Sequence, residues 1–218
     1  MTITIAVPDI QHAVQRAQAC FSAAETELNA ADAKLGDGDT GGMLKRLADG
    51  VAEVDLGATD DLGVAFMNLA KAASASTGSS LGTLVMTALM SLSKATRGQI
   101  TLAAERLPEL IAGICVAMLA RGGAAIGDKT VIDGLQAVAD ALGAAEPSTY
   151  RAIAARAAQE ALKTFRDRPN RIGRARLYGE KSRGLDDPGM LALSKFCSAL
   201  AANDPAEKPA TLQEGQLS

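Results

Sequence analysis

Three aspartates in a glycine-rich segment form the strongest chemical signal in the chain. Asp32, Asp37 and Asp39 fall within DAKLGDGDTGGM, residues 32–43, hereafter the acidic loop. Because glycine adopts positive φ and lets the backbone approach a ligand closely, the loop can turn its carboxylates towards one point. Carboxylates without neighbouring Cys or His favour hard cations such as Mg²⁺, Ca²⁺ or Mn²⁺. The spacing therefore predicts a metal-binding loop.

Two expected helices would position the acidic loop. Apolar residues recur at helical spacing over about 9–29 and again from 40 onward. An acidic side chain near the C-terminus of a helix is unfavourable unless a cation offsets it, which supports a metal beside Asp32. An EF-hand is excluded because no Glu stands at its twelfth position. The alternative is a solvated turn in which Asp39 or Thr40 caps the following helix.

A second segment carries hydroxyl groups. SASTGSS, residues 74–80, separates two expected helices. Unpaired N–H groups and hydroxyls at the start of a helix form a cradle for an anion such as phosphate. The helix that begins at about residue 40 offers a second such place beside the expected metals. Ordinary N-capping by Ser or Thr is the alternative role of residues 74–80.

The segment RGGAAIGDKT, residues 121–130, approaches the P-loop pattern without matching it. One residue too many separates Gly127 from Lys129, and the preceding segment is helical rather than a strand. We therefore expect turns at Gly122 and Gly127, and a cap at Asp128 for the helix that follows.

The long connection over residues 166–189, hereafter the arginine loop, is rich in positive charge. It shows no apolar period, and structureless connections above about 15 residues in compact domains are usually functional lids or disordered linkers. Its charge suits contact with phosphate, and a solvated loop is the alternative. The basic residues are Arg166, Arg168, Arg171, Arg174, Arg176, Lys181 and Arg183.

Composition excludes several classes of function. A net charge of −3, with no basic stretch outside the arginine loop, predicts no nucleic-acid partner. No secretory signal is visible and no apolar run reaches the roughly 20 residues of a membrane span, so we expect a cytoplasmic protein without a membrane partner. Three separated cysteines in apolar segments indicate reduced thiols. The lone histidine, His12, is expected at the surface and excludes His-based catalysis in this subunit.

An aromatic content of 3% and abundant Ala and Leu predict an all-α fold. Short connections between helices favour an eight-helix antiparallel up-and-down barrel or bundle, as one domain over 1–203 with a flexible tail at 204–218. The connections at 32–43, 74–80 and 166–189 would then share one end. The helix over 103–120 is expected to be a buried central strut. The expected helices are about 9–29, 40 onward, 62–73, 79–94, 103–120, 129–142, 147–165 and 189–201.

In this order, the motifs resemble the nucleotide-binding (DhaL-type) subunit or domain of dihydroxyacetone kinases. The resemblance covers nearly the whole chain. It implies a helical barrel that binds ADP or ATP at one end through two Mg²⁺ ions and acts in phosphoryl transfer. The motifs are Asp32 with GDGDTG at 36–41, the turn Thr77–Ser80, GDKT at 127–130 followed by Asp133, and GRARLYGEKS at 173–182 followed by Asp187-Pro-Gly189.

The resemblance also implies site residues. Asp32, Asp37 and Asp39 match the family's metal ligands. The ketose of such kinases is held through a histidine on a separate ketose-binding subunit, so no catalytic residue is implied here. Phosphoryl transfer suits this division, because positioning and charge neutralisation supply most of the catalysis. The implied phosphate and nucleotide contacts are Thr40, Gly41, Gly42, Met43, Gly78, Ser79, Ser80, Gly122, Val131, Arg174, Asp187, Pro188 and Gly189.

Several alternatives stay open. Thr40 departs from the family pattern, in which His often follows the second loop aspartate. The same DGDTG motif also resembles that of the nucleotide domain of bacterial fatty acid kinases, which work with a lipid-binding partner. A non-catalytic nucleotide-binding adaptor and a helical protein that holds only Ca²⁺ are further alternatives. The phosphate source is either exchanging ATP or a bound ADP rephosphorylated by a sugar-phosphotransferase protein.

Overall fold

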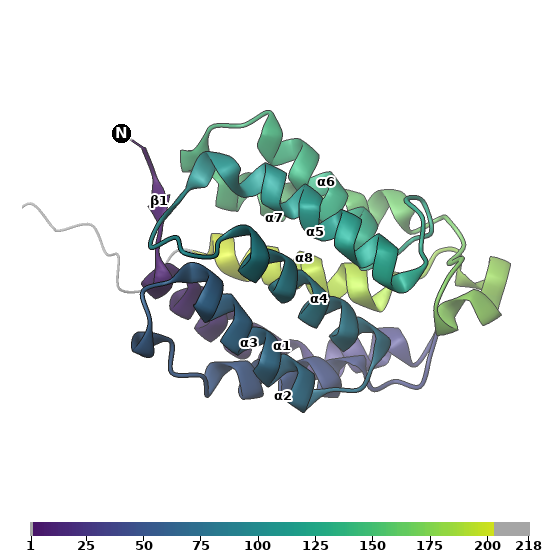
Figure 1. Ribbon diagram of the computed structural model, residues 1–218. Coiled ribbons are helices and arrows are strands. Elements are labelled where there is room, and N and C mark those ends of the chain that lie inside the picture. The colour runs from purple at the N-terminus through teal and green to yellow at the C-terminus, as the bar shows by residue number, and fades with distance from the viewer. Residues whose placement is uncertain (1, 203–218) are drawn as a thin grey trace, which may run out of the picture.

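Eight α-helices stand side by side around a closed ring (Figure 1). The computed structural model describes residues 2–202, so the expected domain end at 203 and the tail at 204–218 lie outside the described residues. Each helix packs against the next, and α8 packs against α1 to close the ring. The predicted all-α antiparallel barrel is confirmed. The helices are α1 Val7–Asp32, α2 Thr40–Ala52, α3 Leu62–Ser76, α4 Ser80–Ala95, α5 Leu107–Gly122, α6 Val131–Gly143, α7 Tyr150–Phe165 and α8 Pro188–Ala201.

The apolar stripes of the helices face the centre of the ring. They line an apolar cavity of about 340 Å³, to which every described helix except α7 contributes side chains. Leu47, Phe66 and Leu89 are examples from α2, α3 and α4. The α7 helix lies in the ring between α6 and α8 but is set back from the cavity, and its Ala157 and Ala158 belong to a separate apolar cluster with side chains of α6 and α8. Removing these stripes from water supplies the main driving force for closing the barrel.

The α5 helix differs from its sequence-based description. It forms part of the barrel wall between α4 and α6, and Val116 on its outer face is 68% exposed. The prediction of a buried central strut was therefore wrong. A nearly uniform apolar sequence gave no preferred face, and the neighbours of α5 bury only one side, at Leu110, Ile114 and Met118. The helix also starts at Leu107 rather than 103, because Leu102–Ala103 forms strand β2.

Other boundaries shift by a few residues. The α1 helix continues to Asp32, α3 takes in residues 74–76, and α6 starts only at Val131. Asp128 does not cap α6, since Thr130 does so by accepting a hydrogen bond from Ile132 N at 3.2 Å. The remaining short elements are strand β1 Thr4–Ile5, antiparallel to β2, and the 3₁₀ helices Leu56–Ala58 (η1), Ala104–Arg106 (η2), Pro147–Thr149 (η3) and Arg174–Ser182 (η4).

The connections singled out in the sequence meet at one end of the barrel, opposite β1 (Figure 1). The arginine loop, expected to be structureless, contains η4 and reaches over this end. Arg171 N donates to Asp128 O at 3.1 Å, which joins the arginine loop to the connection before α6. The expectation that these segments share one end is confirmed. Within residues 2–202, no helix combines the length and apolar character needed to cross a membrane.

Candidate functional site

The acidic loop brings three carboxylates together. Asp32, Asp37 and Asp39 each offer an oxygen that lies within 4.8 Å of those of the other two. Asp32, the last residue of α1, is buried, whereas Asp37 and Asp39 are exposed. Three carboxylates this close repel one another unless protons, cations or hydrogen bonds offset their charge. The arrangement is therefore suited to a cation with oxygen ligands.

Hydrogen bonds from the backbone shape the loop around Asp32. Its Oδ2 accepts from Asp39 N at 3.0 Å and from Thr40 N at 3.2 Å. Glycines make this fold of the chain possible. A Cβ at Gly36 would lie 2.6 Å from Asp32 Oδ1, and Gly38 has a φ of 76°, which residues with a Cβ seldom adopt. The glycines of the motif thus serve to place the Asp32 carboxylate.

Asn29, one turn before Asp32, is a contributor that the sequence reasoning missed. Its Oδ1 accepts from Gly41 N at 2.8 Å and from Gly42 N at 3.1 Å. Together with the bonds to Asp32, this leaves the amides at the start of α2 already satisfied. A phosphate at this place would therefore meet the Thr40 hydroxyl and the field of the helix rather than free amides. The spacing of Asn and Asp three residues apart on one helix face was the available signal.

Asp39 occupies the N-cap position of α2 but makes no side-chain capping bond there. Its carboxylate stays free to face Asp32 and Asp37. The alternative in which Asp39 caps α2 is wrong in this respect. Ser79 behaves in the opposite way, since its Oγ accepts from Gly82 N at 2.9 Å and caps α4. Exposed Ser80 follows as the first residue of α4.

The beginnings of α4, α6 and α8 converge beside this region. A Cβ placed at Gly189 would lie 3.3 Å from Val131 Cβ and 3.7 Å from Leu81 Cδ1. A Cβ at Gly122, the last residue of α5, would lie 3.5 Å from Leu84 Cδ2 on α4. Four segments far apart in sequence therefore share one corner of the barrel end.

Arg174 links the arginine loop to the acidic loop. It lies at the start of η4 and forms an ion pair with Asp37. Both side chains are exposed. Because a guanidinium is permanently charged and presents several donors, it can bind phosphate oxygens as readily as a carboxylate. Arg174 is thus placed to serve an anion that metal ions at the acidic loop would hold.

Asp187 caps α8 from within the protein. Its Oδ1 accepts from Met190 N at 3.0 Å, and its Oδ2 accepts from Asn170 Nδ2 at 2.9 Å. Removal of this carboxyl group from solvent raises its pKa to about 6, and the two hydrogen bonds oppose that rise. Of the other expected contacts, Gly78 lies directly before Ser79, the N-cap of α4, and Pro188 is the first residue of α8.

Comparison with known proteins gives this geometry a family context. Residues 34–202 match the DAK2 domain. The chain belongs to the DAK2-domain family. Relatives of this DAK2-domain chain include the L-erythrulose 1-kinase of Mycolicibacterium smegmatis, 37% identical over 186 residues, and the dihydroxyacetone kinase of Citrobacter freundii, 31% identical over 195 residues. The alignments cover 81% and 88% of the chain but 32% and 34% of the relatives, so the chain spans about a third of their length.

A shorter DAK2-domain relative matches along most of its length. The ADP-binding subunit DhaL of the PEP-dependent dihydroxyacetone kinase of Escherichia coli is 28% identical over 187 residues, which cover 83% of this chain and 89% of that subunit. These relatives are kinases. The predicted resemblance to the DhaL-type nucleotide-binding subunit is confirmed.

Solved structures of the C. freundii dihydroxyacetone kinase share the fold. The native form superposes with a TM-score of 0.69 at 28% sequence identity, and covers 88% of this chain and 34% of that one. The same enzyme in complex with AMP-PNP and Mg²⁺ gives a TM-score of 0.67 at 30% identity, with 88% and 33% covered. The DAK2-domain barrel described above is therefore a known protein architecture.

Proposed function

We propose that this chain is the nucleotide-binding subunit of a kinase for small ketoses. It binds ADP or ATP with two Mg²⁺ ions and delivers the terminal phosphoryl group to a ketose on a separate subunit. The observation that carries the proposal is the convergence of three carboxylates at the barrel end that also holds Arg174 and the start of α8. The relatives named above are ketose kinases, and one is solved with AMP-PNP and Mg²⁺, which supports the same chemistry here.

The acidic loop fits magnesium. Asp32, Asp37 and Asp39 supply only carboxylate oxygens, which Mg²⁺ prefers together with phosphate oxygens and water. Magnesium bound there would neutralise phosphate charge during transfer. Asp32 is held by the amides of Asp39 and Thr40, so the chain keeps this ligand in place before any cation binds.

The neighbouring segments fit a nucleotide. The Thr40 and Ser80 hydroxyls and the Arg174 guanidinium are donors for phosphate. Glycine at 189 lets the start of α8 pack closely, since a Cβ there would lie 3.2 Å from Asp187 Oδ1 and 3.3 Å from Val131 Cβ. Asn170 adds an independent observation. Its Oδ1 is the one buried side-chain oxygen or nitrogen in residues 2–202 without a hydrogen-bond partner, and its amide group binds Asp187. The Asn170 amide thus holds the N-cap residue of α8 in place at this end of the barrel.

The acceptor would come from a partner. The chain has one histidine, His12, and it lies in the second turn of α1, roughly 30 Å along that helix from Asp32. No histidine of this chain can therefore hold a ketose beside the acidic loop. Apolar side chains stand exposed on the segments at the site end, at Ile126, Leu177 and Tyr178. We place the contact with the ketose-binding subunit there.

Reconstitution tests the proposal. The chain is mixed with the ketose-binding subunit encoded next to it or copurified with it, with Mg²⁺-ATP and either dihydroxyacetone or erythrulose. Phosphorylated ketose should form, and a double variant Asp37→Asn with Asp39→Asn should abolish its formation while the helical content stays unchanged. Absence of Mg²⁺-ADP binding by calorimetry in the unmodified chain would defeat the proposal.

The same assay separates the alternatives. Transfer to a fatty acid on a lipid-binding partner, with none to ketoses, would identify a fatty-acid-kinase-like system. Nucleotide binding without turnover by any cognate partner would identify an adaptor. The dissociation rate of ADP distinguishes the two phosphate sources, since rapid exchange excludes a permanently bound ADP that a sugar-phosphotransferase protein recharges.

A further inference from the structure

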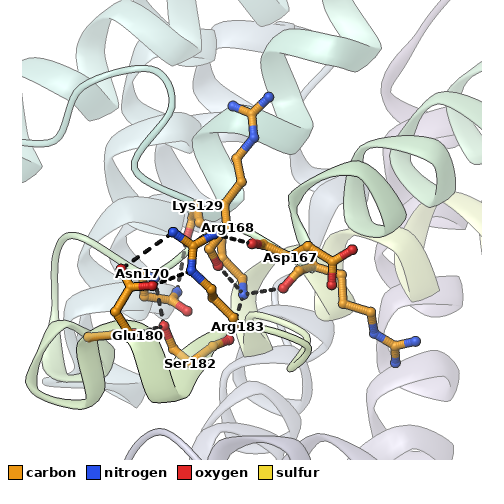
Figure 2. Close-up of polar contacts among 9 residues, drawn as sticks. Lys129, Asp167, Arg168, Asn170, Glu180, Ser182 and Arg183 are labelled. Atoms are coloured by element: carbon orange, nitrogen blue, oxygen red, sulfur yellow. Dashed lines mark hydrogen bonds and ion pairs between the residues drawn. The ribbon is translucent and has the colours of Figure 1, made fainter.

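Lys129, in the connection between α5 and α6, is buried against the arginine loop. Its side chain is among the largest that are fully enclosed, with 1% exposure. Nζ donates to three backbone carbonyls, those of Arg166 at 3.0 Å, Arg168 at 2.9 Å and Ser182 at 2.9 Å (Figure 2). An ammonium group has three donors, so all of them are used. Lys129, the lysine of the P-loop-like segment, therefore binds backbone carbonyls with its ammonium group and has no donor left for a phosphate.

The three carbonyls come from the two arms of one loop. Arg166 and Arg168 follow α7, whereas Ser182 ends η4, so Lys129 holds the outgoing and returning arms together. Gly184 N donates to Arg166 O at 2.9 Å, which closes the same junction. Arg183 adds a bond from its guanidinium to Asp167 O at 2.6 Å (Figure 2).

The backbone of Lys129 is also held in an unusual conformation. Its φ is 64°, and it is the one residue other than glycine with positive φ in the described part of the chain. Left-handed backbone is unfavourable for a residue with a Cβ, which crowds the following carbonyl oxygen. The conformation directs Lys129 O to accept from Asn170 Nδ2 at 3.0 Å. Main chain and side chain of one residue therefore both bind the arginine loop.

Asn170 and Ser182 extend the network to α8. Asn170 N donates to the buried Ser182 Oγ at 2.8 Å, and Asn170 Nδ2 also donates to Asp187 Oδ2. Asp187 is the N-cap of α8, and Gly189 follows beside Val131. The network thus joins Lys129 to the arginine loop on both sides of Arg174, at Asn170 and Ser182, and to the N-cap of α8.

We propose that Lys129 is a positioning residue of the nucleotide site, which fixes the arginine loop so that Arg174 faces the acidic loop and Asp187 caps α8. The inference rests on the proposed function for the ligand, Mg²⁺-nucleotide, and on the contacts above for the mechanism. Removal of the ammonium takes a charged donor from all three carbonyls and leaves Arg168 O without any, whereas Gly184 N still donates to Arg166 O and Leu185 N to Ser182 O. We therefore expect the junction between the two arms to loosen while the barrel wall stays intact.

Trypsin and nucleotide binding report on this role together. The arginine loop carries seven basic residues, at which trypsin can cleave. Cleavage is slow while the loop is well ordered and accelerates when it becomes mobile. Lys129→Met is compared with Lys71→Met, which alters an exposed lysine on α3. We expect cleavage between residues 166 and 183 to accelerate about tenfold or more in Lys129→Met, and its Kd for Mg²⁺-ADP to rise about tenfold to a hundredfold. Binding of Mn²⁺ alone at the acidic loop should not weaken, because the three carboxylates stay in place while Arg174 is released from Asp37.

Two further variants separate the side chain from the strained backbone and from general stability. Lys129→Gly relieves the positive φ, so it should still lose loop protection and Mg²⁺-ADP affinity if the ammonium is responsible. Ser182→Ala removes the acceptor of Asn170 N and should show the same pattern more weakly, which serves if Lys129→Met does not fold. The proposal would be overturned if Lys129→Met folds and shows the same trypsin cleavage rate in the arginine loop and the same Kd for Mg²⁺-ADP as the unmodified chain. It would also be overturned if both Lys129→Met and Ser182→Ala lose the whole barrel. If the unmodified chain itself does not bind Mg²⁺-ADP, the proposed function fails. The cleavage assay still tests whether Lys129 fixes the arginine loop.

Discussion

Arg174 forms an ion pair with Asp37 across 137 positions of sequence. Because both side chains are exposed, the pair itself contributes only about 0–1 kcal/mol to stability. Its significance lies in its location, since it places a permanent positive charge beside three carboxylates. Under the proposed function, the same arginine would neutralise Asp37 when no nucleotide is bound and would contact a phosphate when one is.

Arg174→Ala should therefore affect two ligands in opposite directions. Binding of Mg²⁺-ADP should weaken by about tenfold, because a charge-assisted hydrogen bond to phosphate is lost. Binding of Mg²⁺ or Mn²⁺ alone should strengthen, because the competing guanidinium leaves Asp37. Calorimetry measures the affinity for Mg²⁺-ADP, and electron paramagnetic resonance of Mn²⁺ measures the affinity for the metal alone. Arg176→Ala, in the same 3₁₀ helix, is the matched control. Equal weakening of both ligands would contradict the interpretation.

Asp37→Asn and Asp39→Asn should remove metal binding without loss of the fold. Both side chains are exposed, and neither Asp37 nor Asp39 supplies the acceptor that holds the loop, which is Asp32. Less repulsion between carboxylates should leave the unfolding free energy equal or slightly higher, within about 0.5 kcal/mol. Asp60→Asn, an exposed aspartate before α3, is the control. Full Mn²⁺ affinity in the double variant would refute the metal assignment.

Asn29→Ala should destabilise the start of α2. Two amides, Gly41 N and Gly42 N, lose their acceptor, which costs about 1–2 kcal/mol in the manner of a lost helix cap. Asn29→Asp keeps an oxygen at the same place and should retain most of the stability. Urea unfolding of the three proteins measures the difference, and equal midpoints for Asn29→Ala and the unmodified chain would count against this role.

Asp187 gives the stability a specific pH dependence. Its folded-state pKa of about 6 exceeds the ordinary 3.8, so the folded protein holds this proton more tightly than the unfolded chain does. The corresponding stabilisation is complete below about pH 4 and is lost as pH rises through about 6, with an upper magnitude of about 3 kcal/mol. Asp187→Asn should lack this decline. The difference in unfolding free energy between variant and unmodified chain, measured from pH 4 to 7, should therefore grow in favour of the variant.

The two faces of α5 should respond differently to charge. Val116→Lys, on the exposed face, should change the unfolding free energy by less than about 0.5 kcal/mol. Ile114→Lys, two residues earlier and buried, should cost several kcal/mol or prevent folding, because a lysine there has no partner. Thermal unfolding of both variants checks the wall position of α5. A large loss in Val116→Lys would restore the central-strut description.

Local pattern was sufficient for the helices and for the three aspartates. Helical periodicity and the glycine-rich motif are properties of neighbouring residues, so the eight helices and the acidic loop could be predicted from the sequence. The exposed face of α5 could not, because an apolar helix has no preferred face until its neighbours cover one. Thr130 and not Asp128 caps α6 for a similar reason, since either residue suits an N-cap and the turn around Gly127 selects between them.

What the sequence by itself determined was the type of fold, the family and the donor set of the candidate metal site. The tertiary structure decided which partners complete them: Asn29 under the start of α2, Arg174 against Asp37, and Lys129 between the two arms of the arginine loop. These contacts join residues up to 137 positions apart, or bind a side chain to backbone carbonyls that carry no sequence signal. Only the closure of the barrel brings such groups within hydrogen-bonding distance.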